Sequence, residues 1–331
     1  MKLLSDISDY DRIIVSLSGG KDSVACVLWL IDQGIKPGKI ELWHQCIDGK
    51  GDTHKAFFDW PSTEGYVREF AKQFDMLLGW QWRAHGFYGE LTKENARSHG
   101  IYYQYEGMPD FIEHLPTTTK AAIGTRRKWP AKGADLGTRW CSGALKIDVA
   151  SRVMQNAWGY TGTIAEPVNI LFITGERREE SANRAKYAKA EKHRTWSKSR
   201  NIHHLRPVID LKEKAIWDMM EKYQVLPHPA YYLGFPRLSC RSCIFYSKDH
   251  WTTLNEVDHK AVKMLADMER ELNFTIDHKL TIPEVIKIGK SDITSENRKW
   301  IPRAITEWHG SIISKKWNLP AGAFGKGGGA V

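Results

Sequence analysis

The chain has 331 residues, 42% of them hydrophobic and 26% charged, which is typical of a globular protein with one large or two smaller domains. No apolar run reaches the roughly 18 residues that span a bilayer, and the first residues lack the apolar region of a signal peptide. Five cysteines, an odd number, argue against a disulfide framework, so we expect a cytoplasmic protein without a membrane segment. The net charge of +9 favours polyanionic ligands.

The first informative segment is a glycine-rich turn near the N-terminus. The apolar run 13–15 is followed by residues 18–23 (Ser-Gly-Gly-Lys-Asp-Ser) and then by the mostly apolar segment 24–33. This order predicts a buried strand, a tight turn and a helix. Two glycines let backbone N–H groups approach an anion, and the helix N-terminus adds partial positive charge. With the charge of Lys21 and two serine hydroxyls, the turn is expected to bind a pyrophosphate.

The spacing of this turn is not that of the Walker type, which has four residues between its first glycine and Gly-Lys. Residues 18–23 resemble the PP-loop of the ATP pyrophosphatase (adenine nucleotide alpha hydrolase-like) superfamily, whose signature is Ser-Gly-Gly-x-Asp-Ser. The resemblance implies that ATP is cleaved between its α- and β-phosphates, or that a related adenylyl sulfate is bound. The alternative is a glycine turn that only caps a helix.

Further along, strand-like and helix-like segments alternate. Residues 40–47 predict a second strand, Pro61 starts a helix with aromatic residues at a spacing of four, and residues 168–174 predict another buried strand. The alternation predicts an α/β fold with a doubly wound, mostly parallel sheet and a site at the carboxyl ends of its strands. Residues 83–140 are less regular, and we expect them to carry loops that close over the site.

The chain is expected to divide into three parts. Residues 1–235 would form the nucleotide-binding α/β domain. Residues 236–320 would carry the Cys-x-x-Cys segment and a helical C-terminal region, in which 255–273 shows the periodicity of one helix. The glycine-rich residues 321–331 predict a disordered tail.

A second nucleotide element is predicted at residues 175–184 (Gly-Glu-Arg-Arg-Glu-Glu-Ser-Ala-Asn-Arg), directly after the third predicted strand. A glycine at the carboxyl end of a strand, followed by charged residues, is typical of a phosphate or ribose site, and Arg177 suits bidentate contact with a phosphate. The run resembles the Gly-x-Arg-x-x-Glu-Ser/Gln element of phosphoadenosine phosphosulfate reductase relatives. The alternative is the solvated start of an amphipathic helix.

Three cysteines form the next pattern, Cys141 and the pair Cys240 and Cys243. A Cys-x-x-Cys pair can hold zinc or an iron–sulfur cluster, form a redox disulfide, or simply be buried. Residues 228–240 resemble the Asn-Pro-Leu-Tyr…Gly-Tyr…Ser-Ile-Gly-Cys segment of sulfonucleotide reductases. That resemblance implies that the three cysteines are metal ligands of a four-iron, four-sulfur (4Fe–4S) cluster, whose four-cysteine version has a cysteine where Trp140 stands here.

Several metal assignments stay open at this stage. One iron could remain open and carry a hydrosulfide for sulfur transfer, His250 could be the fourth ligand, the site could hold zinc, or there could be no metal. Sulfonucleotide reductases attack with a cysteine in a C-terminal Glu-Cys-Gly-Leu-His tail, and no cysteine follows Cys243 here. We therefore do not expect sulfite formation by the usual route.

The matching motifs are closest to phage and bacterial proteins of the phosphoadenosine phosphosulfate reductase family. The similarity covers residues 43–49 in the second predicted strand, 138–141 (Thr-Arg-Trp-Cys) and 237–245 around the cysteine pair. This group resembles the sulfur-activating subunit of DNA phosphorothioation systems, which implies a PP-loop combined with an iron–sulfur cluster.

A basic stretch runs from Arg184 to Arg206. It contains eight Lys or Arg residues against one acidic residue, Glu191, with Tyr187 and Trp196 among them. Basic residues interleaved with aromatic ones suit contact with a nucleic acid, DNA or RNA. The alternative is a solvated surface beside the nucleotide.

Together these motifs predict an ATP pyrophosphatase-type adenylating sulfurtransferase that uses ATP and Mg²⁺. An acceptor oxygen attacks the α-phosphate, Lys21 stabilises the departing pyrophosphate, Asp22 orients Mg²⁺, and Arg177 is the third catalytic residue. Sulfur delivered through the three cysteines then displaces AMP. The residues expected to contact the nucleotide are Ser16, Ser18, Gly19, Gly20, Lys21, Asp22, Ser23, His44, Asp48, Gly175, Glu176, Arg177, Glu180 and Ser181.

Two other functions remain as alternatives. One is a sulfonucleotide reductase-like protein without the C-terminal catalytic cysteine, and the other is a non-catalytic subunit that binds a nucleotide or DNA. Beyond the adenine nucleotide, the candidate partners are a nucleic acid, a sulfur-donor protein and a second copy of this chain.

Overall fold

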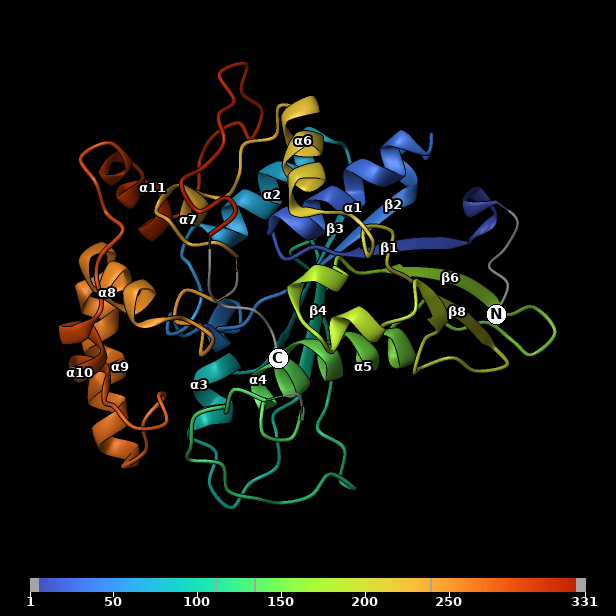
Figure 1. Cartoon of the computed structure of the whole chain (residues 1–331). Helices are drawn as coiled ribbons and strands as arrows, with labels where there is room; N and C mark the ends of the chain where they lie inside the picture. Colours follow the sequence, from blue (N-terminus) through green and yellow to red (C-terminus); the bar gives the residue numbers. More distant parts are fainter. Residues whose placement is uncertain (1–5, 111, 134, 239, 326–331) are drawn as a thin grey trace.

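The computed structural model describes residues 6–110, 112–133, 135–238 and 240–325, and of the predicted tail residues 326–331 lie outside this description. Its strands are β1 (Arg12–Ser16), β2 (Ile40–Gln45), β3 (Leu77–Arg83), β4 (Ile101–Tyr105), β5 (Ile112–Leu115), β6 (Val168–Ile173), β7 (Ala190–Lys192) and β8 (Arg200–Leu205). They form one central sheet in the order β5-β4-β3-β2-β1-β6-β8-β7 (Figure 1). The strands from β3 to β8 in this order run parallel, and β4, β5 and β7 are antiparallel to their neighbours. The predicted doubly wound, mostly parallel α/β sheet is confirmed.

Helices cover both faces of the sheet. The α-helices are α1 (Lys21–Asp32), α2 (Thr63–Gln73), α3 (Gly86–Leu91), α4 (Trp140–Ser142), α5 (Asp148–Asn156), α6 (Glu213–Lys222), α7 (Pro229–Tyr232), α8 (Lys248–Val257), α9 (His259–Leu272), α10 (Ile282–Ile288) and α11 (Ile301–Ile305). Successive side chains of β1 alternate between the two faces, as a strand requires. Ile13 and Val15 pack in the core with α1, α2 and α6, whereas Ile14 packs with α5.

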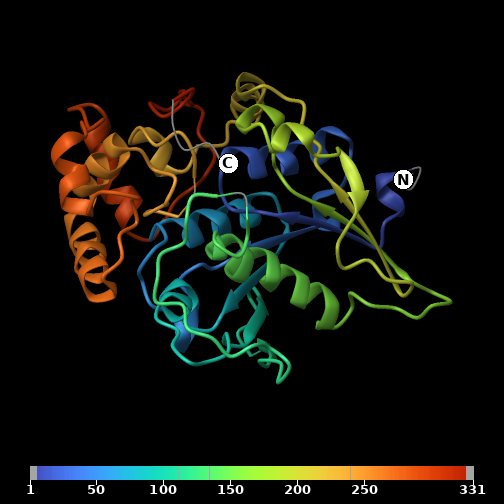
Figure 2. The ribbon, with the colours of Figure 1, turned by 60° about the horizontal axis from the view of Figure 1, so that its bottom comes forward.

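A further hydrophobic core joins the C-terminal helices to the rest of the chain. Helices α8 to α10 contact one another and lie to one side of the sheet (Figure 2). Their core contains Leu254 and Leu265 together with Phe58, Phe87 and Trp140 from earlier segments. The predicted division after residue 235 therefore stays a prediction, because one core draws residues from both sides of it. No helix within the described part of the chain combines the length and apolarity that crossing a membrane would require.

One expectation about local structure was wrong, and a second was only partly right. The segment 255–273 is not one helix, because α8 ends at Val257 and Asp258 caps α9 by accepting the Ala261 N–H at 3.0 Å. The segment 83–140 is not irregular throughout, although its residues Leu136 and Arg139 do line the crevice beside β1. It contributes α3 and the antiparallel strands β4 and β5, which extend the sheet away from its centre. Strands β4 and β5 form because they pair with a neighbouring strand. Periodicity within a single segment does not show such pairing.

The topology leaves a crevice beside β1. Strand β1 lies between β2 and β6, so the chain moves to one side of β1 first and later returns to the other side. In open α/β sheets, ligands bind outside the carboxyl ends of the strands at such a switch point. Residues 17–23 follow β1 and residues 174–184 follow β6, so both predicted nucleotide elements lie at the same edge of the sheet.

Candidate functional site

The turn between β1 and α1 has the form predicted for an anion-binding loop. Gly19 has φ of +80°, a conformation that side-chain-bearing residues rarely adopt, and Gly20 directly precedes the first residue of α1. The serines of the turn brace it internally. Ser23 Oγ donates to the Gly20 carbonyl at 2.8 Å and lies 3.2 Å from Ser18 Oγ. The turn is therefore fixed before any ligand arrives, and the first turn of α1 presents N–H groups that have no intrahelical partner.

The turn opens into a cleft of about 910 Å³ at the carboxyl ends of β1, β2, β6 and β8. The cleft brings together eight of the predicted nucleotide contacts: Ser16, Ser18, Gly20, Asp22, Ser23, Gly175, Glu176 and Glu180. The lining does not include six others: Gly19, Lys21, His44, Asp48, Arg177 and Ser181.

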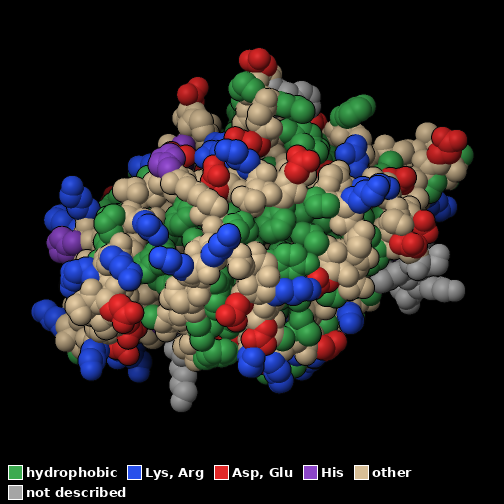
Figure 3. Space-filling model, turned by 90° about the horizontal axis from the view of Figure 1, so that it is seen from above, with side chains coloured by type: hydrophobic (Ala, Val, Ile, Leu, Met, Phe, Trp, Pro, Cys, Tyr) green, Lys and Arg blue, Asp and Glu red, His purple; other side chains and the backbone are tan. Residues whose placement is uncertain are grey.

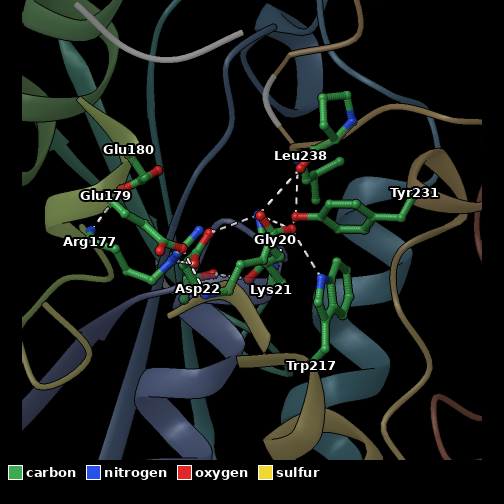
Figure 4. Close-up of polar contacts among 12 residues, drawn as sticks. Gly20, Lys21, Asp22, Arg177, Glu179, Glu180, Trp217, Tyr231 and Leu238 are labelled. Atoms are coloured by element: carbon green, nitrogen blue, oxygen red, sulfur yellow. Dashed lines mark hydrogen bonds and ion pairs between the residues drawn. The ribbon is translucent and has the colours of Figure 1, made fainter. Parts of the chain in front are cut away.

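Lys21 does not point into the cleft. Its side chain is 4% exposed, and its Nζ donates to the Pro236 carbonyl at 3.3 Å behind the turn (Figure 4). The same Nζ lies 3.4 Å from Asp22 and 5.7 Å from the ring centroid of Trp217. Burial opposes the charge, but Asp22 and other partners outweigh it and raise the pKa of Lys21. The ammonium therefore stays charged and holds the turn from the rear.

Arg177 from the second element reaches back to the first. Its Nε lies 2.5 Å from Asp22 Oδ1, and its guanidinium also pairs with Glu179 (Figure 4). Gly175 permits this approach, since a Cβ there would lie 2.7 Å from the Asp22 backbone. Burial alone would raise the pKa of Asp22, but Lys21 and Arg177 lower it below its usual value. The result is an ionised carboxylate fixed at the edge of the cleft.

A hydrogen-bond chain that the sequence analysis missed orients Glu176. Thr174 Oγ1 lies 2.5 Å from Glu176 Oε2 and 2.6 Å from His204 Nε2. A threonine hydroxyl has one proton, so it donates to the carboxylate and accepts from the His204 Nε2–H. Nδ1 of His204 then accepts from Arg206 Nη2 at 3.2 Å. Burial lowers the pKa of His204 to about 3, which keeps this ring neutral. The adjacent histidines 203 and 204 would have been a usable signal only if β8 had been predicted.

His44 and Asp48, which were predicted to contact the nucleotide, lie outside the cleft lining and bind backbone groups of the fold. His44 is buried, its Nδ1 donates to the Leu17 carbonyl at 2.8 Å, and burial lowers its pKa to about 4. Asp48 accepts backbone N–H groups of residues 57–59, at 2.8 Å for the nearest. His44 lies on β2 and Asp48 lies shortly after it. This strand is on the side of β1 away from β6, and both side chains stabilise the backbone there.

The three cysteines do not form a metal-ligand set. Within residues 6–325, leaving out 111, 134 and 239, no group of three or more His, Cys, Asp or Glu side chains is placed to hold a metal ion. Burial raises the pKa of Cys141 to about 11. His250 uses Nδ1 to accept the Ser247 N–H at 3.2 Å and caps α8. This arrangement does not support the iron–sulfur cluster, or the zinc, that was expected, and we derive no chemistry through it.

Lys146 occupies the position between the cysteines and the cleft. It lies on a π-helical turn, Gly143–Ile147, which starts two residues after Cys141, and it lines the cleft with Arg139 and Arg237. Burial opposes its charge, but nearby side chains, Cys240 and Asp59 foremost, raise its pKa. A permanent ammonium therefore faces both the thiols and the cleft. π-Helical turns often mark functional sites.

Comparison with known proteins finds one matching family model and, among solved structures, two structures of one enzyme. Residues 113–245 match the family model of the phosphoadenosine phosphosulfate reductase domain, so the predicted resemblance is confirmed for that segment. No curated protein matches the chain. A solved structure of Candida glabrata FMN adenylyltransferase with FMN and the ATP analogue AMPCPP has 10% identity and a TM-score of 0.38, covering 72% of this chain and 57% of that one. The same enzyme with FAD and inorganic pyrophosphate has 11% identity and a TM-score of 0.41, covering 93% and 81%.

The matched family segment includes one side of the cleft. It contains β6, the second nucleotide element and all three cysteines, whereas the turn at residues 18–23 lies before it. The chain spans 57% of the length of the first of the two adenylyltransferase structures.

Proposed function

We propose that the cleft binds ATP and that the protein transfers the adenylyl group to an acceptor oxygen with release of pyrophosphate. The observation that carries this proposal is the braced turn after β1, which opens at the switch point into a 910 Å³ cleft beside the ionised Asp22. Backbone N–H groups and hydroxyls in such a turn are preorganised for phosphate oxygens. An adenylyl sulfate is the alternative ligand for the same turn and cleft.

The proposed roles differ from those expected from sequence. The turn amides hold the departing pyrophosphate, while Lys21 acts behind the turn as a positioning residue. The cations that line the cleft, among them Lys146 and Arg237, face the phosphates instead. Arg177 positions Asp22 and does not contact the ligand.

The acidic side chains of the cleft fit Mg²⁺. Asp22 and Glu176 both line the cleft, and carboxylate oxygens are the ligands that Mg²⁺ prefers. A bound Mg²⁺ would neutralise charge on the phosphates. Arg177 and Thr174 orient these carboxylates, so the ligand positions are set by the folded chain.

The test is release of pyrophosphate from ATP by the full chain with Mg²⁺, with ATP–pyrophosphate exchange as a second readout. Asp22→Asn should lower the rate by about 100-fold, the scale of losing one preorganised electrostatic group. Asp32→Asn is the matched control, since Asp32 is also on α1 but pairs with Lys222 at the surface. Equal rates in the wild type and the Asp22 variant would refute the assignment. Binding of adenylyl sulfate without any turnover of ATP would favour the reductase-like alternative.

A polyanionic acceptor such as a nucleic-acid strand is the second proposal for this site. Lys186, Lys192 and Arg194 line the same cleft, and Lys192 Nζ lies 4.1 Å from the ring centroid of Trp196, which is 38% exposed. Net charge alone does not indicate such a surface, because on the face in Figure 3 basic side chains are spread among acidic ones. Cations and exposed aromatic rings beside a cleft are the combination that holds single strands.

Binding of labelled single-stranded oligonucleotides tests this second proposal. Replacing both Lys192 and Arg194 by alanine should weaken binding and reduce its salt dependence by about two ions. Lys72→Ala, on the exposed side of α2, is the control. Unchanged affinity in the double variant would exclude this wall of the cleft as the acceptor site.

A further inference from the structure

The hydroxyl of Tyr231 lies against the phosphate-binding turn, although this residue is on α7. It accepts the backbone N–H of Lys21 at 3.0 Å and the backbone N–H of Leu238 at 3.1 Å (Figure 4). The side chain is 1% exposed, and its ring packs edge-on against Trp217 with centroids 5.2 Å apart. Lys21 is the first residue of α1, so Tyr231 reaches the helix end that would meet the phosphate.

Among the described residues, the hydroxyl proton of Tyr231 has no hydrogen-bond acceptor. A phenol has one proton and two acceptor positions, and here two backbone N–H groups fill both acceptor positions. Within the part of the chain that the structure describes, no acceptor is found for the proton itself. Tyr231 nevertheless lines the cleft beside Gly20. A buried donor without a protein acceptor, at the rim of an anion site, is placed to bind a ligand oxygen.

We propose that Tyr231 donates this proton to a phosphate oxygen held at the turn of residues 18–23. The inference rests on the proposed function and adds a binding residue that neither sequence motif contains. It also ties the ligand to Leu238, whose Cβ and Cδ2 would lie 3.4 and 3.3 Å from a Cβ at Gly20 and Gly19.

The surroundings of the ring keep it a donor. Burial raises the pKa of Tyr231 above its usual value, even though the nearby Lys21 charge opposes this shift. The hydroxyl is therefore protonated at neutral pH. The Lys21 ammonium, 5.7 Å from the Tyr231 ring centroid, also polarises the phenol in the direction that strengthens its O–H as a donor.

The first experiment compares Tyr231→Phe with the wild type in calorimetric binding of AMPCPP, pyrophosphate and AMP. A hydrogen bond to a charged oxygen predicts that AMPCPP and pyrophosphate bind about tenfold or more weakly to the variant, while AMP is less affected. Tyr232→Phe is the matched control, because that neighbouring hydroxyl donates to the Asn318 carbonyl at 3.3 Å in a different cavity. Equal loss for all three ligands would indicate a merely structural role and overturn the inference.

The second experiment separates donating from accepting, because phenylalanine also removes the acceptor of two N–H groups. Incorporation of 3-fluorotyrosine at position 231 keeps the hydroxyl, strengthens it as a donor and weakens it as an acceptor. A donating role predicts tighter pyrophosphate binding, and unchanged or weaker binding would overturn it. If the wild-type protein binds neither AMPCPP nor pyrophosphate, the proposed function itself fails. If it binds both but the two variants match it, only the role of Tyr231 fails.

Discussion

Arg177 and Asp22 are 155 positions apart in the sequence, yet Arg177 Nε lies 2.5 Å from Asp22 Oδ1. The arginine is 3% exposed and lies behind the carboxylate, which lines the cleft. This contact joins the two motifs predicted to bind the nucleotide into one unit. The arginine of the second motif therefore fixes a carboxylate of the first and does not itself line the cleft.

Removing that arginine should affect both stability and activity. Arg177→Met leaves Asp22 with Lys21 as its remaining cation, and breaking a buried pair from one side costs about 3 kcal/mol. Urea unfolding should show this loss. Lys222→Met is the control, because it breaks the exposed pair with Asp32 on the same helix and should cost less than about 1 kcal/mol. Similar losses in the two variants would contradict the structural importance of the buried pair.

Gly175 should not tolerate a side chain. A Cβ at this position would lie 2.7 Å from backbone atoms of Asp22, so Gly175→Ala must displace the turn or the end of β6. We expect ATP affinity to fall at least about tenfold, measured by calorimetry. Gly38→Ala, where no atom lies within 4 Å of the added Cβ, should bind ATP like the wild type. Normal ATP binding by the Gly175 variant would show that the turn adapts to this approach.

The chain that orients Glu176 should influence nucleotide binding. Thr174→Val removes the hydroxyl between Glu176 and His204, whereas Thr174→Ser retains it. We expect Thr174→Val to raise the KM for ATP about tenfold, and we expect Thr174→Ser to have a KM close to that of the wild type. Steady-state kinetics at saturating Mg²⁺ would measure this. Equal KM values for the two variants would show that the hydroxyl has no such role.

Acid should destabilise the protein through buried histidines. His228 is 0% exposed, accepts the Ala230 N–H on Nδ1 at 3.2 Å, and burial lowers its pKa to about 3. Between pH 6.5 and about 3 the unfolded chain binds a proton at this residue that the folded chain does not, so stability falls as the pH decreases. His228→Gln should reduce the slope of unfolding free energy between pH 7 and 5. An unchanged slope would exclude this histidine as a source of acid sensitivity.

The cysteines should hold no stoichiometric metal. Among the described residues no group of three or more His, Cys, Asp or Glu side chains is placed to hold a metal ion, and the Lys146 ammonium interacts with all three cysteines. Anaerobically purified protein should therefore lack the visible absorption of an iron–sulfur cluster and contain less than one iron or zinc per chain. Stoichiometric iron and sulfide would contradict this expectation and restore a cluster at Cys141, Cys240 and Cys243.

The local motifs were readable because each depends on a few consecutive residues. A strand, two glycines and a helix determine the turn at residues 18–23, and a strand followed by glycine determines the approach at Gly175. Hydrophobic periodicity likewise predicted β1, β2 and β6 and therefore the parallel sheet. The strands β4 and β5 were not predicted, because their place in the sheet depends on antiparallel pairing with β3.

The sequence by itself determined that a phosphate-type turn follows a buried strand, since backbone geometry there is set by glycine and helix propensity over a few residues. Only the tertiary structure decided which charges face the cleft. The Lys21 side chain is held away from the cleft by the Pro236 carbonyl, and His44 is held inward by the Leu17 carbonyl. Those partners are far away in sequence or lie on a neighbouring segment. The direction of a side chain depends on contacts that form only when the sheet and its helices are assembled.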